Sequence, residues 1–258
     1  MDNAEAMIRV DDCWMSYPGK AGDAPTYVLE NVSFEVREGE FVCLVGPSGC
    51  GKSTMLNILG GFLRQTRGQA EVGGAPVGEP DPRRIFVFQE NGVFPWLTVA
   101  ENVGFGLFGL PKDDASQRVS HYIKMVGLAG FERSYPRELS GGMRQRVEIA
   151  RALAAEAHVL YMDEPFGALD FLTRLKMRSD LVRIWQAEKR TILFVTHDIE
   201  EAVQLADRVL VMTRRPATIQ AEVKVELPRP RDLDDPRYLA TRDRIFELMG
   251  MDVHGGGG

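Results

Sequence analysis

The sequence predicts an α/β protein built around a mostly parallel sheet. The apolar run Phe41–Val45 shows no alternation, which is typical of a strand buried on both faces of such a sheet, and it ends in a glycine-rich loop. Further apolar runs are separated by helical patterns, which indicates repeated strand–helix units. The segment from about residue 91 to residue 139 has a helical pattern throughout and interrupts this alternation. We therefore expect an inserted helical subdomain there.

The N-terminal residues predict strands, and the glycine-rich loop precedes a helix. Ile8 and Val10 alternate with polar residues, and the same alternation recurs over residues 32–36. Residues 18–25, between these two patterns, are rich in turn-forming residues. Lys52–Leu59 then predicts the helix that follows the loop.

The remaining elements continue to the C-terminus. Helices are predicted at Ser116–Val126, directly after Asp170, and near Tyr238–Met249. One more strand pattern covers residues 219–225, and a link rich in Pro, Arg and Asp follows it. The later strands are expected at Ile85–Phe88, Val159–Met162, Ile192–Val195 and Val209–Met212.

Composition excludes several classes of protein. Of the 258 residues, 44% are hydrophobic and 26% are charged, as in ordinary globular proteins. The net charge of -6 argues against general nucleic-acid binding, so we expect no nucleic-acid partner. No apolar run is long enough for a membrane span, and the N-terminus lacks the apolar region of a secretory signal. The three cysteines show no metal-ligand spacing and are expected to be reduced thiols.

Residues 46–53, Gly-Pro-Ser-Gly-Cys-Gly-Lys-Ser, fit the phosphate-loop pattern. Glycines let backbone N–H groups turn toward phosphate oxygens, and a helix N-terminus favours anions. Lys52 is expected to reach the β- and γ-phosphates of ATP, and the Ser53 hydroxyl to bind Mg²⁺. A flexible glycine turn is the alternative, but the flanking strand and helix favour phosphate binding. The expected nucleotide-binding residues of this loop are Gly46, Pro47, Ser48, Gly49, Cys50, Gly51, Lys52, Ser53 and Thr54, with Cys50 a small filler and not a nucleophile.

Two acids end the apolar run Val159–Met162. A buried strand delivers such residues to the carboxyl edge of a parallel sheet, where ligands bind in these folds. Asp163 is expected to hold Mg²⁺, and Glu164 to polarise the attacking water. The alternative is a pair of solvated loop residues, which the upstream phosphate loop makes the weaker interpretation.

A second anion-binding pattern lies at residues 139–146, Leu-Ser-Gly-Gly-Met-Arg-Gln-Arg. Ser140 is a good N-cap, and Gly141 and Gly142 expose backbone N–H groups at the start of an amphipathic helix. One nucleotide does not need two such loops from one chain. This stretch resembles the signature sequence of ABC ATPases. Met143 stands where that family usually has glutamine, which puts the contacts of this one side chain in question.

The resemblance covers roughly residues 7–228 and implies a P-loop NTPase core of the RecA-like type. An N-terminal antiparallel β-subdomain and a helical subdomain inserted at about residues 91–143 would complete this nucleotide-binding domain. Residues 229–258 would form a linker, a short helix and a glycine tail.

The same resemblance assigns roles to four more residues. Gln89 matches the glutamine that contacts Mg²⁺ or water and couples to the permease, and Asp170 lies in the loop that crosses the dimer interface. His197 matches the histidine that senses the γ-phosphate. Tyr17 matches the aromatic residue that stacks on adenine, although Trp14 is near it in sequence. The expected catalytic residues are thus Glu164, His197 and Gln89, and the expected Mg²⁺ ligands are Ser53, Gln89 and Asp163.

The implied function is that of the ATP-binding and ATP-hydrolysing subunit of an ABC importer. Two such subunits, in a homodimer or a heterodimer with a related ATPase, would sandwich ATP between one subunit's phosphate loop and the other's signature. They would work on separate transmembrane permease subunits, and indirectly with a solute-binding protein, at the cytoplasmic face of the inner or plasma membrane. Residues 87–99 resemble the ATPases of nitrate, sulfonate and taurine importers, so a small anion is the expected solute. A soluble ABC ATPase without a transport role and an importer of a different solute remain the alternatives.

Overall fold

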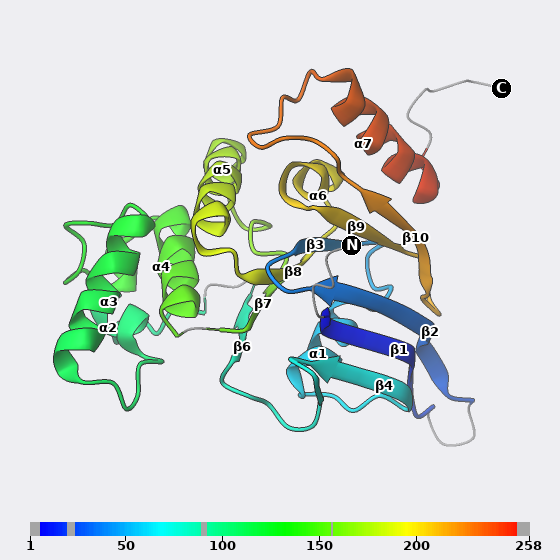
Figure 1. Ribbon diagram of the computed structural model, residues 1–258, viewed down its shortest axis with the longest axis horizontal. Coiled ribbons are helices and arrows are strands. Elements are labelled where there is room, and N and C mark those ends of the chain that lie inside the picture. The colour runs from blue at the N-terminus through cyan, green and yellow to red at the C-terminus, as the bar shows by residue number, and fades with distance from the viewer. Residues whose placement is uncertain (1–5, 20–23, 89–91, 156, 252–258) are drawn as a thin grey trace. The chain divides into compact units, whose positions relative to one another are not determined.

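The computed structural model describes residues 6–19, 24–88, 92–155 and 157–251. Its contacts divide these residues into two compact units (Figure 1). The first unit contains the residues up to Asp81 and those from Arg190 onward, and the second runs from Pro82 to Lys189. The α/β class predicted from the sequence is confirmed.

The first unit begins with an antiparallel sheet whose strand order is β2-β1-β4-β5. Its strands are β1 (Ala6–Tyr17), β2 (Thr26–Arg37), β4 (Arg67–Val72) and β5 (Ala75–Pro76). β1 and β2 are the strands expected from alternation, and their inward side chains, such as Ile8 and Val36, are fully buried. β4 and β5 were not predicted, because they contain few apolar residues.

The same unit holds four adjacent strands in the order β10-β9-β3-β8. β3 (Phe41–Val45) pairs in parallel with β8 (Thr191–Thr196) and β9 (Arg208–Met212), while β10 (Ile219–Lys224) adds an antiparallel edge. Every residue of β3 is buried, as the unbroken apolar run indicates.

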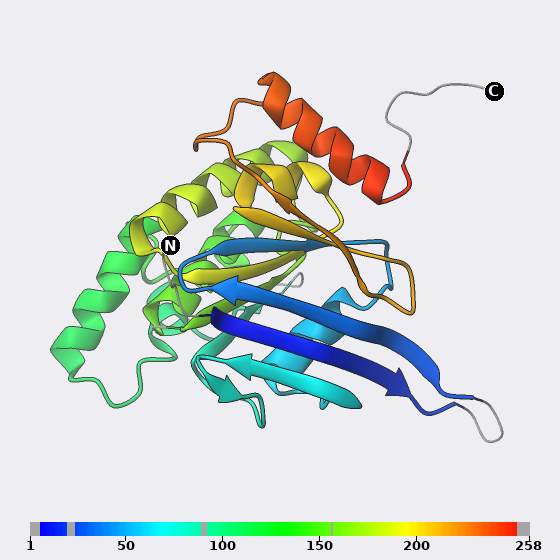
Figure 2. The ribbon, with the colours of Figure 1, turned by 45° about the vertical axis from the view of Figure 1, so that its right-hand side comes forward.

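Three helices accompany these strands in the part of this unit that the structure describes. α1 (Lys52–Gly60) has the start predicted for it and ends one residue later than expected. α6 (Ile199–Leu205) packs on β3, and α7 (Pro236–Leu248) packs on α6 and β10. Figure 2 shows α7 lying along α6 on one side of the sheet.

Among its described residues, the second unit contains a parallel strand pair and four α-helices. β6 (Arg84–Val87) pairs with β7 (Val159–Asp163), and α4 (Gly141–Ala154) packs on β6. α2 (Val99–Gly104) and α3 (Lys112–Met125) pack on α4 and on each other, and α5 (Phe171–Glu188) also contacts α4.

The expectation that residues 91–139 are helical throughout was wrong in part. Among the described residues of this stretch, only α2, α3 and the 3₁₀ turn Pro136–Glu138 are helical. Proline and glycine explain the gaps: Pro95 lies before α2, and residues 104–111 contain three glycines and Pro111.

Candidate functional site

The phosphate loop leaves the buried strand β3 and ends at α1. Lys52 is only 5% exposed, and its Nζ donates hydrogen bonds to the carbonyl oxygens of Gly46 at 2.8 Å and Pro47 at 3.1 Å. The side chain of Lys52 is therefore enclosed, and its ammonium group is held against the backbone of the loop. An ammonium group has three N–H donors, so these two bonds leave one for a phosphate oxygen.

The glycines of this loop are required by its conformation. Gly49 and Gly51 have φ values of +73° and +128°, which L-residues rarely adopt. A Cβ on Gly51 would lie 2.8 Å from Leu29 Cδ2, whereas a Cβ on Gly49 would meet nothing within 4 Å. One side of the loop is thus packed and the other is open, as a phosphate cradle requires. With the charge of Lys52, the loop fits the triphosphate of ATP.

Cys50 is buried and packs inside the loop. A Cβ on Gly46 would approach Cys50 Sγ to 3.0 Å, so the two residues are in close contact. Burial raises the pKa of the Cys50 thiol despite the nearby charge of Lys52. A buried thiol of raised pKa is a poor nucleophile, in agreement with the filler role expected from the sequence.

His197 emerges beside the phosphate loop. β3 and β8 are parallel neighbours, and Val45 is paired with Thr196, so Gly46 and His197 follow at the same edge of the sheet. His197 is exposed, while its neighbour Thr196 is buried and donates from Oγ1 to Glu201 Oε2 at 2.7 Å. The first unit therefore brings the loop and the expected γ-phosphate sensor together.

Arg215 also belongs to this site, although the sequence did not predict a role for its side chain. Its Nη2 donates to the Gly49 carbonyl oxygen at 2.8 Å, which supports the exposed turn of the loop. Its position in a turn after β9 gave no local signal, because the contact spans 166 residues.

Tyr17 lies at the end of β1 and is 40% exposed. The nearby Trp14 packs edge-on against Tyr27 with ring centroids 6.3 Å apart, and its Nε1 donates to Asp12. Trp14 and Tyr27 therefore contact each other, and the adenine-stacking role expected for Tyr17 stays a prediction.

In the second unit, the two acids lie at the end of the buried strand β7 as predicted, with Asp163 its last residue and Glu164 directly after it. Both Asp163 and Glu164 are half-buried. Val87 of β6 is paired with Met162, so the segment after β6 leaves the same edge as Asp163. Gln89, which lies in that segment, is outside the described residues. Glu164 has a φ of +47°, a left-handed conformation that the sequence did not indicate.

The signature residues begin α4, and Asp170 begins α5. Ser140 Oγ accepts from the Met143 N–H at 3.2 Å and Asp170 Oδ1 from the Thr173 N–H at 3.1 Å, so both act as N-caps. The N-terminal ends of α4 and α5 are in contact, because a Cβ on Gly142 would lie 2.6 Å from Thr173 Cγ2. The N-cap prediction for Ser140 is confirmed, and the two motifs form one surface of this unit.

Glu148, on α4, was not found from the sequence. It is fully buried, and its carboxylate accepts hydrogen bonds from the N–H groups of Phe88 at 3.1 Å and Gly92 at 3.2 Å. Burial raises the pKa of Glu148, although these two N–H donors and Arg151 act in the opposite direction. Glu148 thus links Phe88 and Gly92 to the signature helix α4. These two residues flank the segment that contains Gln89.

Aromatic side chains form a row on the second unit, close in sequence to the same segment. The ring centroid of Phe94 lies 4.4 Å from that of Phe105 and 5.5 Å from that of Trp96, and Phe105 contacts Phe108. Trp96 and Phe108 are 70% and 82% exposed. Exposed aromatic clusters of this kind mark interaction surfaces.

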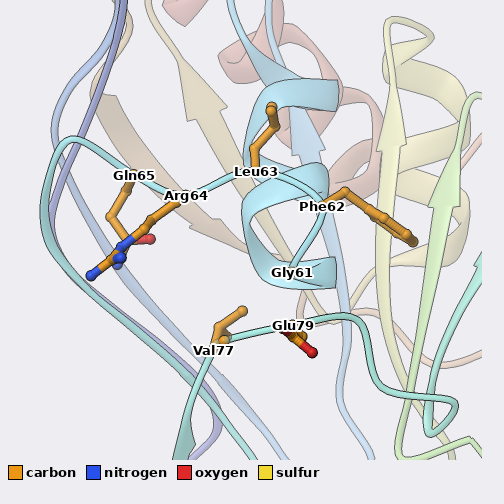
Figure 3. A pocket seen from close by; sticks show the side chains of 8 residues that line it. Gly61, Phe62, Leu63, Arg64, Gln65, Val77 and Glu79 are labelled. Carbon is orange, nitrogen blue, oxygen red and sulfur yellow. The ribbon is translucent and has the colours of Figure 1, made fainter.

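A cavity of about 560 Å³ lies at the opposite end of α1 from the phosphate loop (Figure 3). The labelled side chains of Arg64 and Gln65 lie on one side of it and those of Val77 and Glu79 on another. Its eight lining residues include none of the expected site residues. It is therefore separate from the phosphate loop.

No helix in the described part of the chain has both the length and the apolar character needed to cross a membrane.

The fold and these motifs define a nucleotide-binding cassette of the P-loop class. The family model described as ABC transporter matches residues 29–167, more than half of the chain. The dimeric post-hydrolysis structure of the ATP-binding cassette MJ0796 with ADP and Pi is similar with a TM-score of 0.72 and 33% identity, covering 85% of this chain and 99% of that one. The structure of cbiO1 from Clostridium perfringens gives a TM-score of 0.77 at 25% identity, covering 96% and 100%. The expected fold class is thereby confirmed.

Curated relatives give the same result. An uncharacterized ABC transporter ATP-binding protein of Methanocaldococcus jannaschii is 47% identical over 227 residues, which are 87% of this chain and 85% of that protein. The aliphatic sulfonates import ATP-binding protein SsuB of Bacillus cereus is 43% identical over 227 residues, 87% of this chain and 90% of that one. The chain belongs to the ABC transporter ATP-binding proteins, and it is the ATPase subunit of a transporter.

Proposed function

We propose that this ATPase energises the import of a small anion of the sulfonate type through a separate membrane permease. The observation that carries the proposal is the 43% identity to an aliphatic sulfonates import ATP-binding protein over nine tenths of that relative. The solute itself would be recognised by the permease and a solute-binding protein, since the expected site residues of this chain bind and hydrolyse ATP.

Within this proposal, the residues of the first unit bind and sense the nucleotide. Lys52 and the N–H groups of the loop hold the phosphates, and the exposed side of Gly49 admits them. His197, at the neighbouring strand end, donates a hydrogen bond from a ring N–H to a γ-phosphate oxygen and so reports hydrolysis.

The acids of the second unit carry the hydrolytic step. Oxygen donors suit Mg²⁺, so Ser53 and Asp163 would hold the ion, which supplies charge neutralisation to the phosphate oxygens. Glu164 orients the attacking water and accepts its proton. Gln89, in the segment between Phe88 and Gly92, would contact Mg²⁺ or water.

Two subunits act together in the proposal. Ser140, Gly141 and Gly142 present an anion-binding helix start, and Thr173 of α5, the helix capped by Asp170, lies against it, so this surface suits the γ-phosphate of a nucleotide held by a partner subunit. The exposed aromatic row around Trp96 suits the permease, because aromatic side chains are enriched at the centres of protein interfaces. The chain would then lie at the cytoplasmic face of the membrane through its permease.

The test is reconstitution of the complete transporter in vesicles with its solute-binding protein. We expect ATPase activity to rise when an aliphatic sulfonate, taurine or nitrate is added, and Glu164→Gln to abolish that activity while retaining ATP binding. Glu247→Gln, an exposed glutamate on α7, is the matched control and should behave as wild type. Stimulation only by a sugar, peptide or metal ion would overturn the solute class, and full activity of Glu164→Gln would overturn the assigned base.

A further inference from the structure

The chain beyond residue 228 makes ordered contacts with α6, the helix that starts two residues after His197. This segment consists of the link from Arg229 to Asp235 and the helix α7. Tyr238 and Ile245 of α7 are 1% and 0% exposed, so the helix is firmly packed on the first unit.

Two arginines of the link bind the C-terminal end of α6. Arg231 Nη1 donates to the Val203 carbonyl oxygen at 2.5 Å, and Arg229 Nη2 donates to the Leu205 carbonyl oxygen at 2.6 Å. The last carbonyls of a helix have no partner within it and carry partial negative charge, which cations stabilise. Arg229 also pairs with Asp207 at 2.6 Å, so the arginine itself is fixed.

Two residues of α7 bind the N-terminal end of α6. The Tyr238 hydroxyl donates to the Glu200 carboxylate, and Arg242 Nη1 lies 3.4 Å from Glu200 Oε1. Glu200 is the second residue of α6, so the two ends of this seven-residue helix are held by one segment.

The first turn of α6 is in turn connected to the backbone around His197. Asp198 Oδ1 caps the helix by accepting from the Glu201 N–H at 3.3 Å, and its own N–H donates to Thr196 Oγ1 at 3.0 Å. Thr196 and Glu201 are both buried and hydrogen bonded to each other. The residues on each side of His197 are therefore fixed to the first turn of α6.

We propose that the segment from Arg229 to Met249 is a brace that holds α6 and thereby positions His197 for its role in ATP hydrolysis. The inference rests on the proposed function of His197. Tyr238 and Arg231 act as positioning residues, because they bind Glu200 and Val203 of α6 and not the nucleotide loop.

The chemistry of these contacts supports a positioning role. Desolvation, followed by repulsion from Arg229, lowers the pKa of Arg231 to about 10. Burying a guanidinium is unfavourable, and apolar side chains would fill the same space at less cost. The polar groups of the two arginines and of Tyr238 instead select one geometry at each end of α6. Orientation of a neighbouring residue requires such a fixed geometry.

The experiment uses the full-length chain with Tyr238→Phe and Arg231→Gln, and Arg237→Gln as a control on the same helix. Arg237 pairs with Asp235 at the start of α7, away from α6. The ring signals of the four histidines are recorded by NMR and assigned with His197→Ala. ATPase kinetics are measured on the assembled transporter, and thermal unfolding confirms that each variant is folded.

We expect both brace variants to shift the His197 ring signal and to lower kcat about threefold or more, with KM for ATP unchanged within about twofold. Arg237→Gln should do neither. An unchanged His197 signal in both brace variants overturns the inference, even if their thermal stability falls. If His197→Ala itself keeps the wild-type kcat, the proposed function of His197 fails instead, and the ring signal alone then decides the inference.

Discussion

Glu148 offers the sharpest test of how the signature helix is linked to the segment around Gln89. Its enclosed carboxylate accepts the N–H groups of Phe88 and Gly92. The fit is close, because a Cβ on Gly92 would lie 2.7 Å from Glu148 Oε1. The Arg151 guanidinium completes the group at 4.0 Å. Glu148→Ala removes the shared acceptor and leaves all three donors in place.

The size of the effect follows from these contacts. A hydrogen bond to a charged acceptor contributes about 1.5 kcal/mol or more, so two contribute about 3 kcal/mol. Removing a buried charge recovers part of this stabilisation, because burial is unfavourable to the charged form and raises the pKa of Glu148. Glu148→Ala should therefore lower the free energy of unfolding by about 2 kcal/mol.

The assay is urea unfolding at pH 7, with the midpoint and slope compared between wild type and variant. Glu247→Ala is the control, because Glu247 is exposed on α7 and its loss should change the free energy by less than about 0.5 kcal/mol. If Glu148→Ala costs no more than the control, the two hydrogen bonds do not stabilise the protein and the reasoning is wrong.

Two further predictions concern pH and the phosphate loop. Because burial raises the pKa of Glu148 above 4.5, the part of its stabilisation that comes from the protonated form is fully present below about pH 4.5 and is lost as the pH rises through the raised value. The difference in unfolding free energy between wild type and Glu148→Gln should therefore decrease from pH 4 to pH 7, and a difference independent of pH would contradict this. Gly51→Ala should lower the unfolding free energy by roughly 2–4 kcal/mol through its φ of +128° and the 2.8 Å approach to Leu29. Urea unfolding checks this against Gly78→Ala, whose Cβ would meet nothing within 4 Å and which should be nearly neutral.

The parts of the site that sequence predicted are those with a local pattern. The loop after β3 and the acids at the end of β7 each follow an unbroken apolar run, and a strand end is also a fixed edge of the sheet. Ser140 could be placed as an N-cap because capping depends on a few adjacent residues. These features need no knowledge of distant contacts.

The parts that sequence did not predict depend on contacts between distant residues. Glu148 is one glutamate in an amphipathic helix, and its partner Phe88 is 60 residues away. Arg231 lies in a link whose composition suggests exposure, yet it binds α6 28 residues earlier. β4, which pairs with β1 across more than fifty residues, has little alternation of its own. Tertiary pairing, and not local preference, determines all three.

The backbone at Glu164 adds an independent argument for its proposed role as the base. Among the described residues, four that are not glycine have positive φ: Asp12, Asn31, Glu164 and Lys189. Asp and Asn tolerate this conformation, and Lys189 ends α5 as a left-handed C-cap. Glu164 has no such local reason, and the conformation costs of order 1 kcal/mol or more. Strained residues cluster at functional sites, and here the strained residue begins a turn in which the Glu164 carbonyl oxygen accepts from the Gly167 N–H at 3.1 Å, so the backbone at the end of β7 supports the proposed role of Glu164.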